Sequence, residues 1–259
     1  MSPGHTIQIY RDNEQLASAA VEFIIHSAQK HIAETGQFTW VLAGGSTPRR
    51  VYELLGMSAN KDNLDWQHTY LFWGDERAVP PNHKDSNFRM VEESLLEQVP
   101  VPVENIFRMR GEIHPDDASI QYEDAIRQFF SHKTHSHSTS NHSRDIPAFD
   151  LVLLGIGPDG HTASLFPDSS ALLEHERLVV AVEHNQPPPP LVARLTMTLP
   201  LINHAKEIVF LASGAGKAHV LPQILGDKPN PNLPAARVQP VKGKLLWLLD
   251  ADAAAGLQV

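Results

Sequence analysis

The sequence FDLVLLGIGPDGHTASLFP occupies residues 149–167 and places a largely apolar run directly before a glycine-rich turn. The run over 149–154 predicts a strand that is buried on both faces, as in a parallel sheet. The glycines that follow allow a tight turn and a close approach of the backbone to a ligand. Asp159 and His161 lie in this turn, so the sequence predicts an acid–base site at the carboxyl end of a parallel strand.

The same turn also matches a nucleotide-binding pattern. Its glycines spell G-x-G-x-x-G, and Glu183 ends the next apolar run near the ~20-residue distance typical of dinucleotide-binding folds. Pro158 and Pro167 interrupt the helix that such a fold needs after the glycines. The motif also lies past the middle of the chain, whereas the fingerprint normally opens its domain. A dinucleotide oxidoreductase is therefore a disfavoured alternative.

Strands and helices alternate on both sides of this stretch. Apolar patterns predict strands at 38–43, 69–73, 105–109, 149–154, 178–182, 192–199, 207–212 and 244–249. Helices are predicted at 15–35, 87–98, 115–130 and 216–225, and another is predicted to start at Pro48 with Thr47 as its cap. This alternation predicts an α/β fold with a mostly parallel sheet, in a single domain over residues 1–259.

Two compositionally biased segments interrupt the pattern without dividing the chain. Residues 131–143 are rich in His, Ser, Thr and Asn, which favours a solvated surface loop near 131–145 over a metal site. Pro187–Pro190 is a proline run, typical of a stiff extended connector.

Composition excludes several classes of protein. The chain has 259 residues, a net charge of −9 and no cysteine. The acidic balance disfavours binding to nucleic acid or to an anionic membrane, and the missing thiols exclude disulfides and thiolate chemistry. No basic and then apolar leader opens the chain, and no apolar run approaches the ~20 residues of a membrane helix. We therefore expect a cytoplasmic protein.

A second glycine-rich turn follows the predicted strand at 38–43. Gly44 and Gly45 lead into the hydroxyls of Ser46 and Thr47 at a predicted helix start, with Arg49 close behind. Backbone amides at such a turn, together with the helix dipole, form a cradle for phosphate in outline. An ordinary strand-to-helix turn explains the residues equally well, and the spacing is not that of a Walker motif.

Three further positions carry charges suited to an anionic substrate. Asp75 and Arg77 follow the strand at 69–73, where Asp75 could bind sugar hydroxyls and Arg77 could bind phosphate or polarise a carbonyl. A solvated loop with a local ion pair is the simpler interpretation of this run. Lys217 follows the strand at 207–212 and stands at a helix start, where a cation is unfavourable unless an anion binds there. Arg194 lies inside a strand-like run and is uninformative alone.

Taken together, four of these segments carry a family resemblance over nearly the whole chain. The segments are LAGGSTPRRVYELL (42–55), WGDERAVPPNHKDSN (73–87), GIGPDGHTASLFP (155–167) and SGAGKAHVL (213–221). In this order they resemble the 6-phosphogluconolactonases. The resemblance implies a three-layer αβα, Rossmann-like fold with the active site at the carboxyl ends of the strands. It also implies hydrolysis of 6-phospho-D-glucono-1,5-lactone to 6-phosphogluconate in the pentose phosphate pathway, without cofactor or metal.

The resemblance assigns a role to most of the candidate residues. His161 would be the general base that activates water, with Asp159 orienting the substrate or the turn. The 6-phosphate would be held by Gly44, Gly45, Ser46, Arg194 and Lys217. Arg77 would stabilise the oxyanion or share in phosphate binding. A monomer or weak homodimer is expected.

Two alternatives within the sugar-phosphate class stay open. Glucosamine-6-phosphate deaminases share the phosphate loop and the Asp-Gly-His turn but typically carry a glutamate where this chain has Phe166. Because phenylalanine cannot serve ring opening or relay a proton, Phe166 favours the lactonase. A non-catalytic sugar-phosphate sensor would keep the cradle and lose the base, whereas His161 is present.

Overall fold

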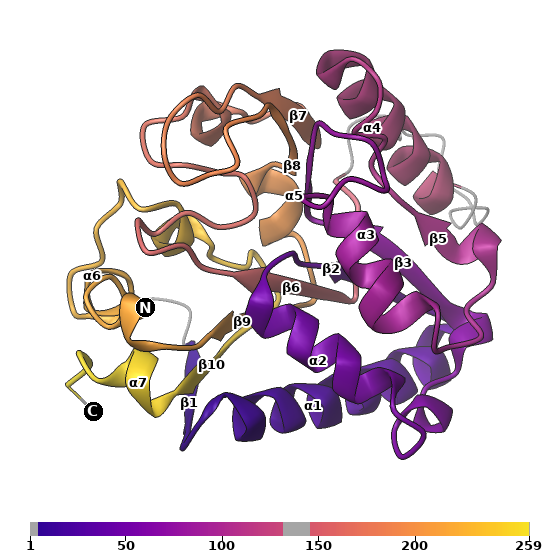
Figure 1. The fold of residues 1–259 in the computed structure, drawn as a ribbon, viewed down its shortest axis with the longest axis horizontal. Helices are drawn as coiled ribbons and strands as arrows, with labels where there is room; N and C mark the ends of the chain where they lie inside the picture. Colours follow the sequence, from indigo (N-terminus) through magenta and orange to yellow (C-terminus); the bar gives the residue numbers. More distant parts are fainter. Residues whose placement is uncertain (1–4, 132–145, 259) are drawn as a thin grey trace.

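The computed structural model describes residues 5–131 and 146–258, and its centre is a parallel sheet of seven strands. The predicted histidine-rich loop at 131–145 therefore falls almost entirely outside the described residues. In spatial order the sheet contains β1 (Thr6–Tyr10), β10 (Lys244–Asp250), β9 (Glu207–Ala212), β6 (Leu151–Gly155), β2 (Phe38–Leu42), β3 (Thr69–Trp73) and β5 (Ile106–Phe107). All of their pairings are parallel, which confirms the predicted α/β class (Figure 1).

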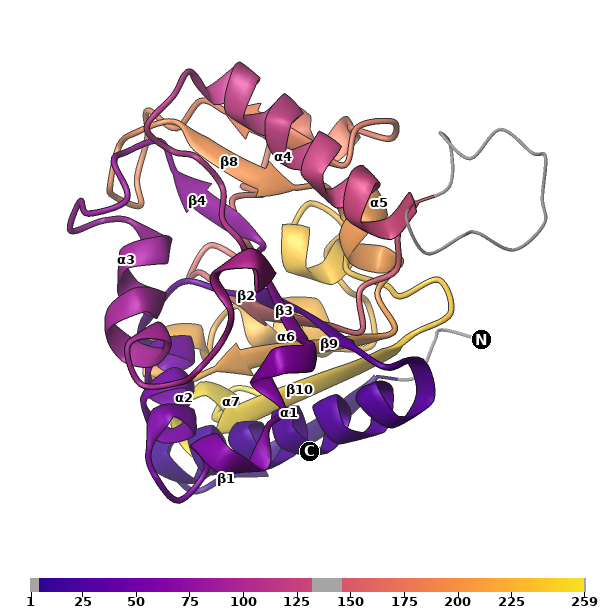
Figure 2. The same cartoon turned by 90° about the vertical axis from the view of Figure 1, so that its right-hand side faces the viewer.

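Helices cover both faces of the sheet and contact it through aromatic side chains. On one face, His31 of α1 (Asn13–Thr35) stacks on Phe38, and Tyr52 of α2 (Ser46–Gly56) meets Trp40 edge-on. On the other face, Phe129 of α4 (Pro115–Ser131) packs on Phe72 and Phe107, whose own rings stack 4.6 Å apart. Figure 2 shows α4 and α1 on opposite sides of the strands. These contacts place the apolar core on both faces of the sheet.

A second sheet, which the sequence analysis does not separate from the first, lies under α4. It consists of β4 (Asp75–Arg77), β8 (Arg194–Met197) and β7 (Val179–Val182), and both of its pairings are antiparallel. The predicted strands at 178–182 and 192–199 therefore exist, but they do not extend the parallel sheet. Periodicity cannot show which sheet a short buried strand joins, because partners are set by tertiary structure.

Several predicted boundaries need correction. α2 begins at Ser46 with Gly45 as its N-cap, so the predicted cap by Thr47 is wrong. The predicted helix at 87–98 is α3 (Asn87–Val91) followed by a π-helical turn over Glu92–Leu96. The predicted helix at 216–225 is a 3-10 turn over Ala215–Lys217 and then α6 (Leu221–Leu225). The short strands β1 and β4 were not predicted.

The remaining helices are short. They comprise α5 (Leu199–Asn203), α7 (Ala251–Ala254) and further 3-10 turns at Lys61–Asn63, Trp66–His68, Val103–Asn105, Ser170–Leu173 and Pro234–Arg237.

The order of the strands reverses between β2 and β6. From β2 the chain proceeds outward to β3 and β5, and from β6 it proceeds in the opposite direction to β9 and β10. In open α/β sheets a crevice opens at such a switch point, outside the carboxyl ends of the strands, and ligands bind there. The topology therefore marks the space above β2 and β6 as the place to look for a site.

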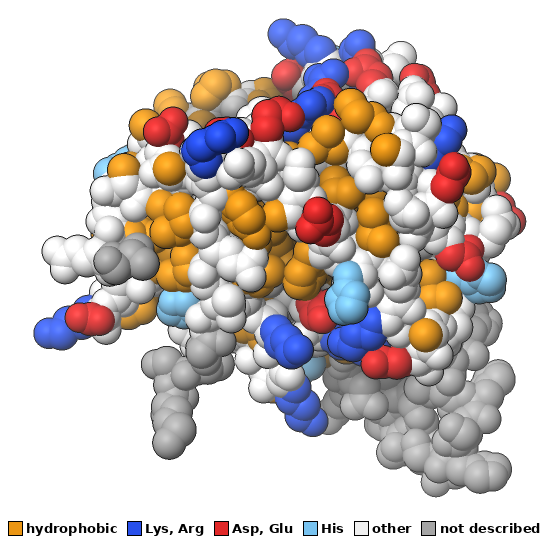
Figure 3. Space-filling view, turned by 90° about the horizontal axis from the view of Figure 1, so that it is seen from below, with side chains coloured by type: hydrophobic (Ala, Val, Ile, Leu, Met, Phe, Trp, Pro, Cys, Tyr) orange, Lys and Arg blue, Asp and Glu red, His pale blue; other side chains and the backbone are white. Residues whose placement is uncertain are grey.

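No helix within residues 5–131 and 146–258 is both long and apolar enough to cross a bilayer. On the face seen from below, charged side chains of both signs lie among hydrophobic ones (Figure 3). The exposed large hydrophobic side chains of the described residues come from separate parts of the chain, as Met57, Ile120 and Leu173 illustrate. Scattered exposure of this kind is normal for a globular protein.

Candidate active site

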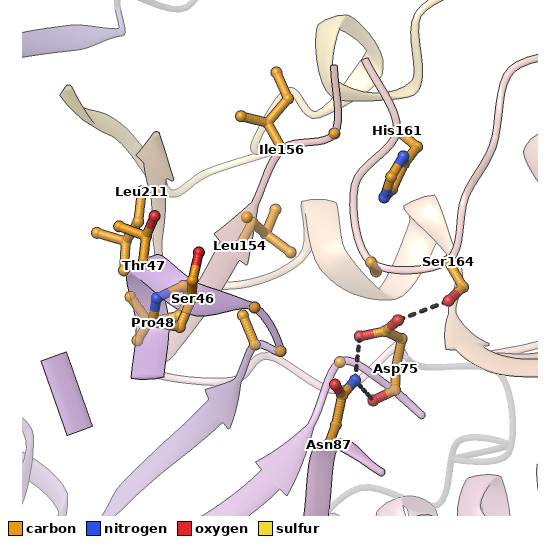
Figure 4. Close-up of a pocket in the computed structure, with 18 of the residues that line it drawn as sticks. Ser46, Thr47, Pro48, Asp75, Asn87, Leu154, Ile156, His161, Ser164 and Leu211 are labelled. Atoms are coloured by element: carbon orange, nitrogen blue, oxygen red, sulfur yellow. Dashed lines mark hydrogen bonds between the residues drawn. The ribbon is translucent and has the colours of Figure 1, made fainter. Parts of the chain in front are cut away.

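Four loops meet in one pocket at the carboxyl end of the parallel sheet. They follow β9, β6, β2 and β3, which are consecutive neighbours in the sheet. The pocket has a volume of about 360 Å³, and its lining includes every residue predicted for the site except Asp159. Figure 4 shows His161 across the pocket from Ser46 and Thr47. The sheet thus brings together motifs that are up to about 170 residues apart in the chain, as Ser46 and Lys217 are.

Asp159 holds the imidazole of His161 in a defined orientation. Asp159 Oδ1 lies 2.6 Å from His161 Nδ1 and also accepts a hydrogen bond from the His161 backbone N–H at 3.3 Å. Burial alone would raise the pKa of Asp159, but the hydrogen bond and charge of His161 lower that pKa below its ordinary value. Since an ionised carboxylate only accepts, this contact favours the tautomer of the neutral imidazole in which Nδ1 carries the proton and Nε2 is free to accept one. The pair is therefore arranged as a general base with an orienting carboxylate.

The turn around this pair requires glycine and does not lead into a helix. A Cβ on Gly157 would lie 2.1 Å from His161 Nδ1 and 2.5 Å from Asp159 Oδ1, so any side chain would displace the dyad. Gly157 N–H donates to the His161 carbonyl at 2.9 Å, which closes the turn. Residues 156–169 form turns and an isolated bridge, whereas a dinucleotide fingerprint needs a helix there. The glycines thus present the histidine.

The loop after β2 presents a free helix N-terminus to the pocket. Gly45 is the N-cap of α2 with φ 105°, and within residues 5–131 and 146–258 no side chain caps this end of the helix. The hydroxyls of Ser46 and Thr47 are therefore not used as the cap. Gly44 approaches Asn87 so closely that a Cβ would lie 2.1 Å from Asn87 Oδ1. This arrangement leaves backbone amides directed at the pocket, as anion-binding turns require.

Two arginines face each other where the small sheet borders the pocket. Arg77 of β4 and Arg194 of β8 are directly paired in the antiparallel register, and Arg194 is only 4% exposed. Burial, and then the positive charge of Arg77, lower the pKa of Arg194. Nε of Arg77 is buried and has no hydrogen-bond partner among the residues that the structure describes, while Nη1 donates to the Asp85 carbonyl. Like charges directly opposite in a sheet repel, so this pair favours an anion between or beside the two groups.

A third cation, Lys217, enters the pocket from the loop after β9. Burial lowers the pKa of Lys217, and the charge of Asp159 opposes that effect. The loop is fixed by Asp250, which accepts hydrogen bonds from the Ser213 hydroxyl and the Gly214 backbone N–H. A half-buried lysine beside the histidine turn is suited to binding an anionic group.

Asp75 builds the floor of the pocket. One of its carboxylate oxygens accepts from the Ser164 hydroxyl at 2.6 Å, and the other accepts from the Asn87 side chain at 3.1 Å (Figure 4). The Asp75 side chain is buried, so the interpretation of this run as a solvated loop is wrong for Asp75. Sequence reasoning missed Asn87 and Ser164 as pocket residues, although both lie inside the quoted motifs.

A second hollow of about 440 Å³ adjoins the pocket and shares Gly45, Ser46, Arg77 and Asn87 with it. Its lining carries the four cations Arg49, Arg77, Lys84 and Arg89 and one carboxylate, that of Glu93. Arg49 and Arg89 are paired with Glu53 and Glu93, at 3.2 and 2.7 Å. The approach to the pocket is therefore rich in positive charge, although the chain as a whole is acidic.

Comparison with known proteins identifies the family of this chain. Residues 11–247 match the family described as glucosamine-6-phosphate isomerases/6-phosphogluconolactonase. A 6-phosphogluconolactonase of Synechocystis is 39% identical over 97% of this chain and 98% of its own length. The human 6-phosphogluconolactonase is 36% identical over 100% of this chain and 95% of its own length. The structure of 6-phosphogluconolactonase from Trypanosoma cruzi superimposes with a TM-score of 0.86 at 28% identity, covering 100% of this chain and 99% of that one. The family match and these relatives show that the chain belongs to the glucosamine-6-phosphate isomerase/6-phosphogluconolactonase family.

Proposed function

We propose that this protein hydrolyses 6-phospho-D-glucono-1,5-lactone to 6-phospho-D-gluconate, a step of the pentose phosphate pathway. One observation carries the proposal most directly. His161, which is held by Asp159, lines a single pocket together with Lys217 and the facing pair Arg77 and Arg194. A base at one point and several cations elsewhere in the same pocket match a substrate with a reactive ester and an anionic end. The family and the named relatives support the same reaction.

The chemistry requires one water and one base. His161 Nε2 takes a proton from water as the water oxygen bonds to C1 of the lactone, and the carbonyl oxygen becomes an oxyanion. The bond from C1 to the ring oxygen then breaks, and the imidazolium returns the proton to that oxygen. Asp159 stabilises the imidazolium through Nδ1. A positioned base of this kind contributes roughly 10²–10⁴-fold to the rate.

The cations would hold the distant phosphate. In this proposal Gly44, Gly45, Ser46, Arg194 and Lys217 bind the 6-phosphate, and Arg77 serves the phosphate or the oxyanion. Asp75 belongs to the substrate-binding set by its place in the lining. Because its two oxygens already accept hydrogen bonds from Ser164 and Asn87, it would act mainly by fixing those two groups. No cofactor or metal takes part in this scheme.

An aminosugar-phosphate isomerase is the second candidate, since the family includes such enzymes. The ring of Phe166 lies 4.8 Å from the His161 ring and lines the pocket. Because isomerisation needs a carboxylate relay near this position, an aromatic side chain there favours the lactonase. A cytoplasmic location and a monomeric or weakly dimeric state stay predictions.

The test is a coupled assay in which freshly generated 6-phosphogluconolactone is followed against its spontaneous hydrolysis. We expect the wild-type protein to accelerate its loss, and His161→Ala to lower kcat by roughly 10²–10⁴-fold while still binding 6-phosphogluconate. Ammonia release from glucosamine 6-phosphate, with no acceleration of lactone loss, would instead establish the isomerase. Wild-type turnover by His161→Ala would remove His161 as the base.

A further inference from the structure

The proline run forms one wall of the pocket, and two side chains fasten it. Pro188 and Pro189 line the pocket, yet prolines have no N–H with which to join a backbone ladder. His184 Nε2 donates to the Pro188 carbonyl at 2.6 Å. Arg194 Nη2 donates to the Pro190 carbonyl at 2.7 Å, and its Nε donates to the Val192 carbonyl at 3.2 Å. The position of the wall and the position of the Arg194 guanidinium therefore depend on each other.

His184 also reaches the catalytic dyad through one aromatic ring. Its imidazole stacks on Phe166 with the centroids 4.1 Å apart and the planes at 15°. Phe166 in turn packs on His161, whose Nδ1 is held by Asp159. The His184 side chain is nearly buried, at 5% exposure. One residue thus contacts both the wall that holds an anion-binding arginine and the ring that borders the base.

We propose that His184 is a positioning residue for the lactonase reaction, acting through two separable contacts. The hydrogen bond to Pro188 sets the proline wall and, through Pro190, the guanidinium of Arg194. The stack on Phe166 sets the rotation of His161. The first contact serves substrate binding and the second serves the chemical step. The inference rests on the proposed function, because it assigns effects to binding and to turnover of the same substrate.

Two variants separate the contacts. His184→Phe keeps an aromatic ring against Phe166 and loses the donor to Pro188. His184→Gln keeps an N–H donor at a similar reach and loses the ring. For His184→Phe we expect KM, and the Kd for 6-phosphogluconate, to rise roughly 3- to 10-fold with kcat within about twofold of wild type, the effect of one lost hydrogen bond. For His184→Gln we expect the reverse, with kcat lowered roughly 3- to 10-fold and KM nearly unchanged, the same scale for a lost ring contact.

The chain offers a matched control in His204, whose Nδ1 lies 2.7 Å from the carbonyl of Pro200 four residues earlier. His204 does not line the pocket. His204→Gln should change neither kcat nor KM. Binding of gluconate, which has no phosphate, should weaken less than that of 6-phosphogluconate in His184→Phe, since Arg194 is assigned to the phosphate.

The outcomes distinguish the two proposals. Wild-type protein without lactonase activity contradicts the proposed function. Active wild-type protein with both His184 variants at wild-type kcat and KM overturns the positioning role. The role is also overturned if both variants show the same pattern, with kcat lowered and KM raised by similar factors. A lower melting temperature with wild-type kcat and KM would likewise show that His184 serves only the stability of the fold. Circular dichroism shows that each variant is folded before its kinetics are compared.

Discussion

At the scale of single residues, the Asp159–His161 pair is the smallest unit on which the proposed chemistry depends. The sequence predicted both side chains for the site but not what Asp159 does. The 2.6 Å contact supplies that role, because it fixes which imidazole nitrogen is free. Spacing of two residues in a turn does not determine whether two side chains meet. Here the meeting depends on Gly157 leaving room for both.

Asp159→Asn should separate orientation from binding. The amide can occupy the same space, but it cannot stabilise the imidazolium and can donate to Nδ1, which would favour the wrong tautomer. We expect kcat to fall by roughly 10²–10⁴-fold, with the Kd for 6-phosphogluconate within about threefold of wild type. Asp168→Asn is the control, since Asp168 is an exposed residue of the same loop at φ 61°, which asparagine tolerates. An active Asp159→Asn enzyme would contradict the dyad.

Lys217 should give the affinity for phosphorylated ligands an alkaline limit. Burial lowers the pKa of Lys217, and only the charged amine attracts the phosphate. The affinity for the phosphate is therefore at its full value below the lowered pKa of Lys217. It is lost as the pH rises through that pKa, at a lower pH than it would be for a solvated lysine. The Kd of 6-phosphogluconate, measured by calorimetry from pH 7 to 10, should rise in the wild type. Lys217→Gln should bind weakly at every pH with a flat profile, and exposed Lys228→Gln should match wild type. Identical profiles for Lys217→Gln and wild type would refute the assignment.

Arg194 illustrates what single positions cannot show in sequence. It lies in an apolar run and gives no signal alone, yet its register opposite Arg77 makes a paired cationic site. That register joins residues 117 positions apart, and the sequence of a short strand does not indicate which strand it pairs with. By contrast, Lys217 and the glycine turns were predictable, because each follows a clear apolar strand.

At the scale of elements, the large parallel sheet was predictable and the small antiparallel one was not. Long apolar strands such as β6 and β9 are recognisable from composition, as are helices with an amphipathic face such as α1 and α4. β4 has only three residues, Asp75–Arg77, and all are charged. β4 forms because its backbone pairs with the antiparallel neighbour β8. Tertiary pairing here overrides local propensity.

The opposite end of the sheet contains a buried charge cluster that serves stability. Glu207, at the start of β9, accepts from the Ser27 hydroxyl at 2.5 Å and lies 3.5 Å from Lys30 Nζ. His31 Nε2 lies 3.6 Å from Glu207, and His31 Nδ1 lies 3.4 Å from Asp150. Burial acts to raise the pKa of Glu207, but His31, Ser27 and Lys30 lower it from 4.5 to about 2. The cluster ties α1 to the amino ends of β6 and β9.

Glu207→Gln should therefore destabilise the fold in a pH-dependent way. Because the folded-state pKa is lowered, the contribution of the carboxylate is present above about pH 4.5 and is lost as the pH falls toward 2. At pH 7 we expect the free energy of unfolding in urea to fall by about 1–3 kcal/mol, with the difference shrinking at pH 3. Glu34→Gln is the control, since Glu34 lies 3.8 Å from His31 but is 56% exposed. A loss that is equal at both pH values would mean that Glu207 acts through packing alone.

At the scale of the whole molecule, topology explains why separate motifs form one site. The strand order reverses between β2 and β6, so the loops after both strands border the same crevice, and the loops after β3 and β9 flank it. The family resemblance carried by the ordered motifs implied an active site at the carboxyl ends of the strands, where such loops lie. The sequence did not reveal the enclosure of the pocket by the proline wall, because that depends on side-chain bonds to carbonyls of the prolines.

The distribution of charge over the molecule has a measurable consequence. Acidic residues outnumber Lys and Arg by 30 to 21, yet four cations line the hollow beside the pocket. A dianionic substrate is repelled by the protein as a whole and attracted by this region, so the hollow should raise the rate of productive encounter. Lys84 and Arg49 are the exposed members of this set, and neither lines the active pocket itself. Arg49 is paired with Glu53, so Lys84 is the better residue to test.

Lys84→Glu should lower kcat/KM by roughly 3- to 10-fold at low ionic strength while leaving kcat within about twofold. The loss should fade as salt is added, because at 0.1 M the Debye length is about 10 Å and exposed charges are largely screened beyond it. Measuring kcat/KM for the phosphorylated lactone from about 10 to about 300 mM salt tests this. Lys228→Glu is the control of equal charge change, because Lys228 is exposed and lines neither the pocket nor the hollow. If Lys228→Glu is equally impaired, net charge rather than the hollow governs the encounter. If the effect of Lys84→Glu survives high salt, the lysine binds substrate directly, and the substrate must then extend from the pocket into the hollow.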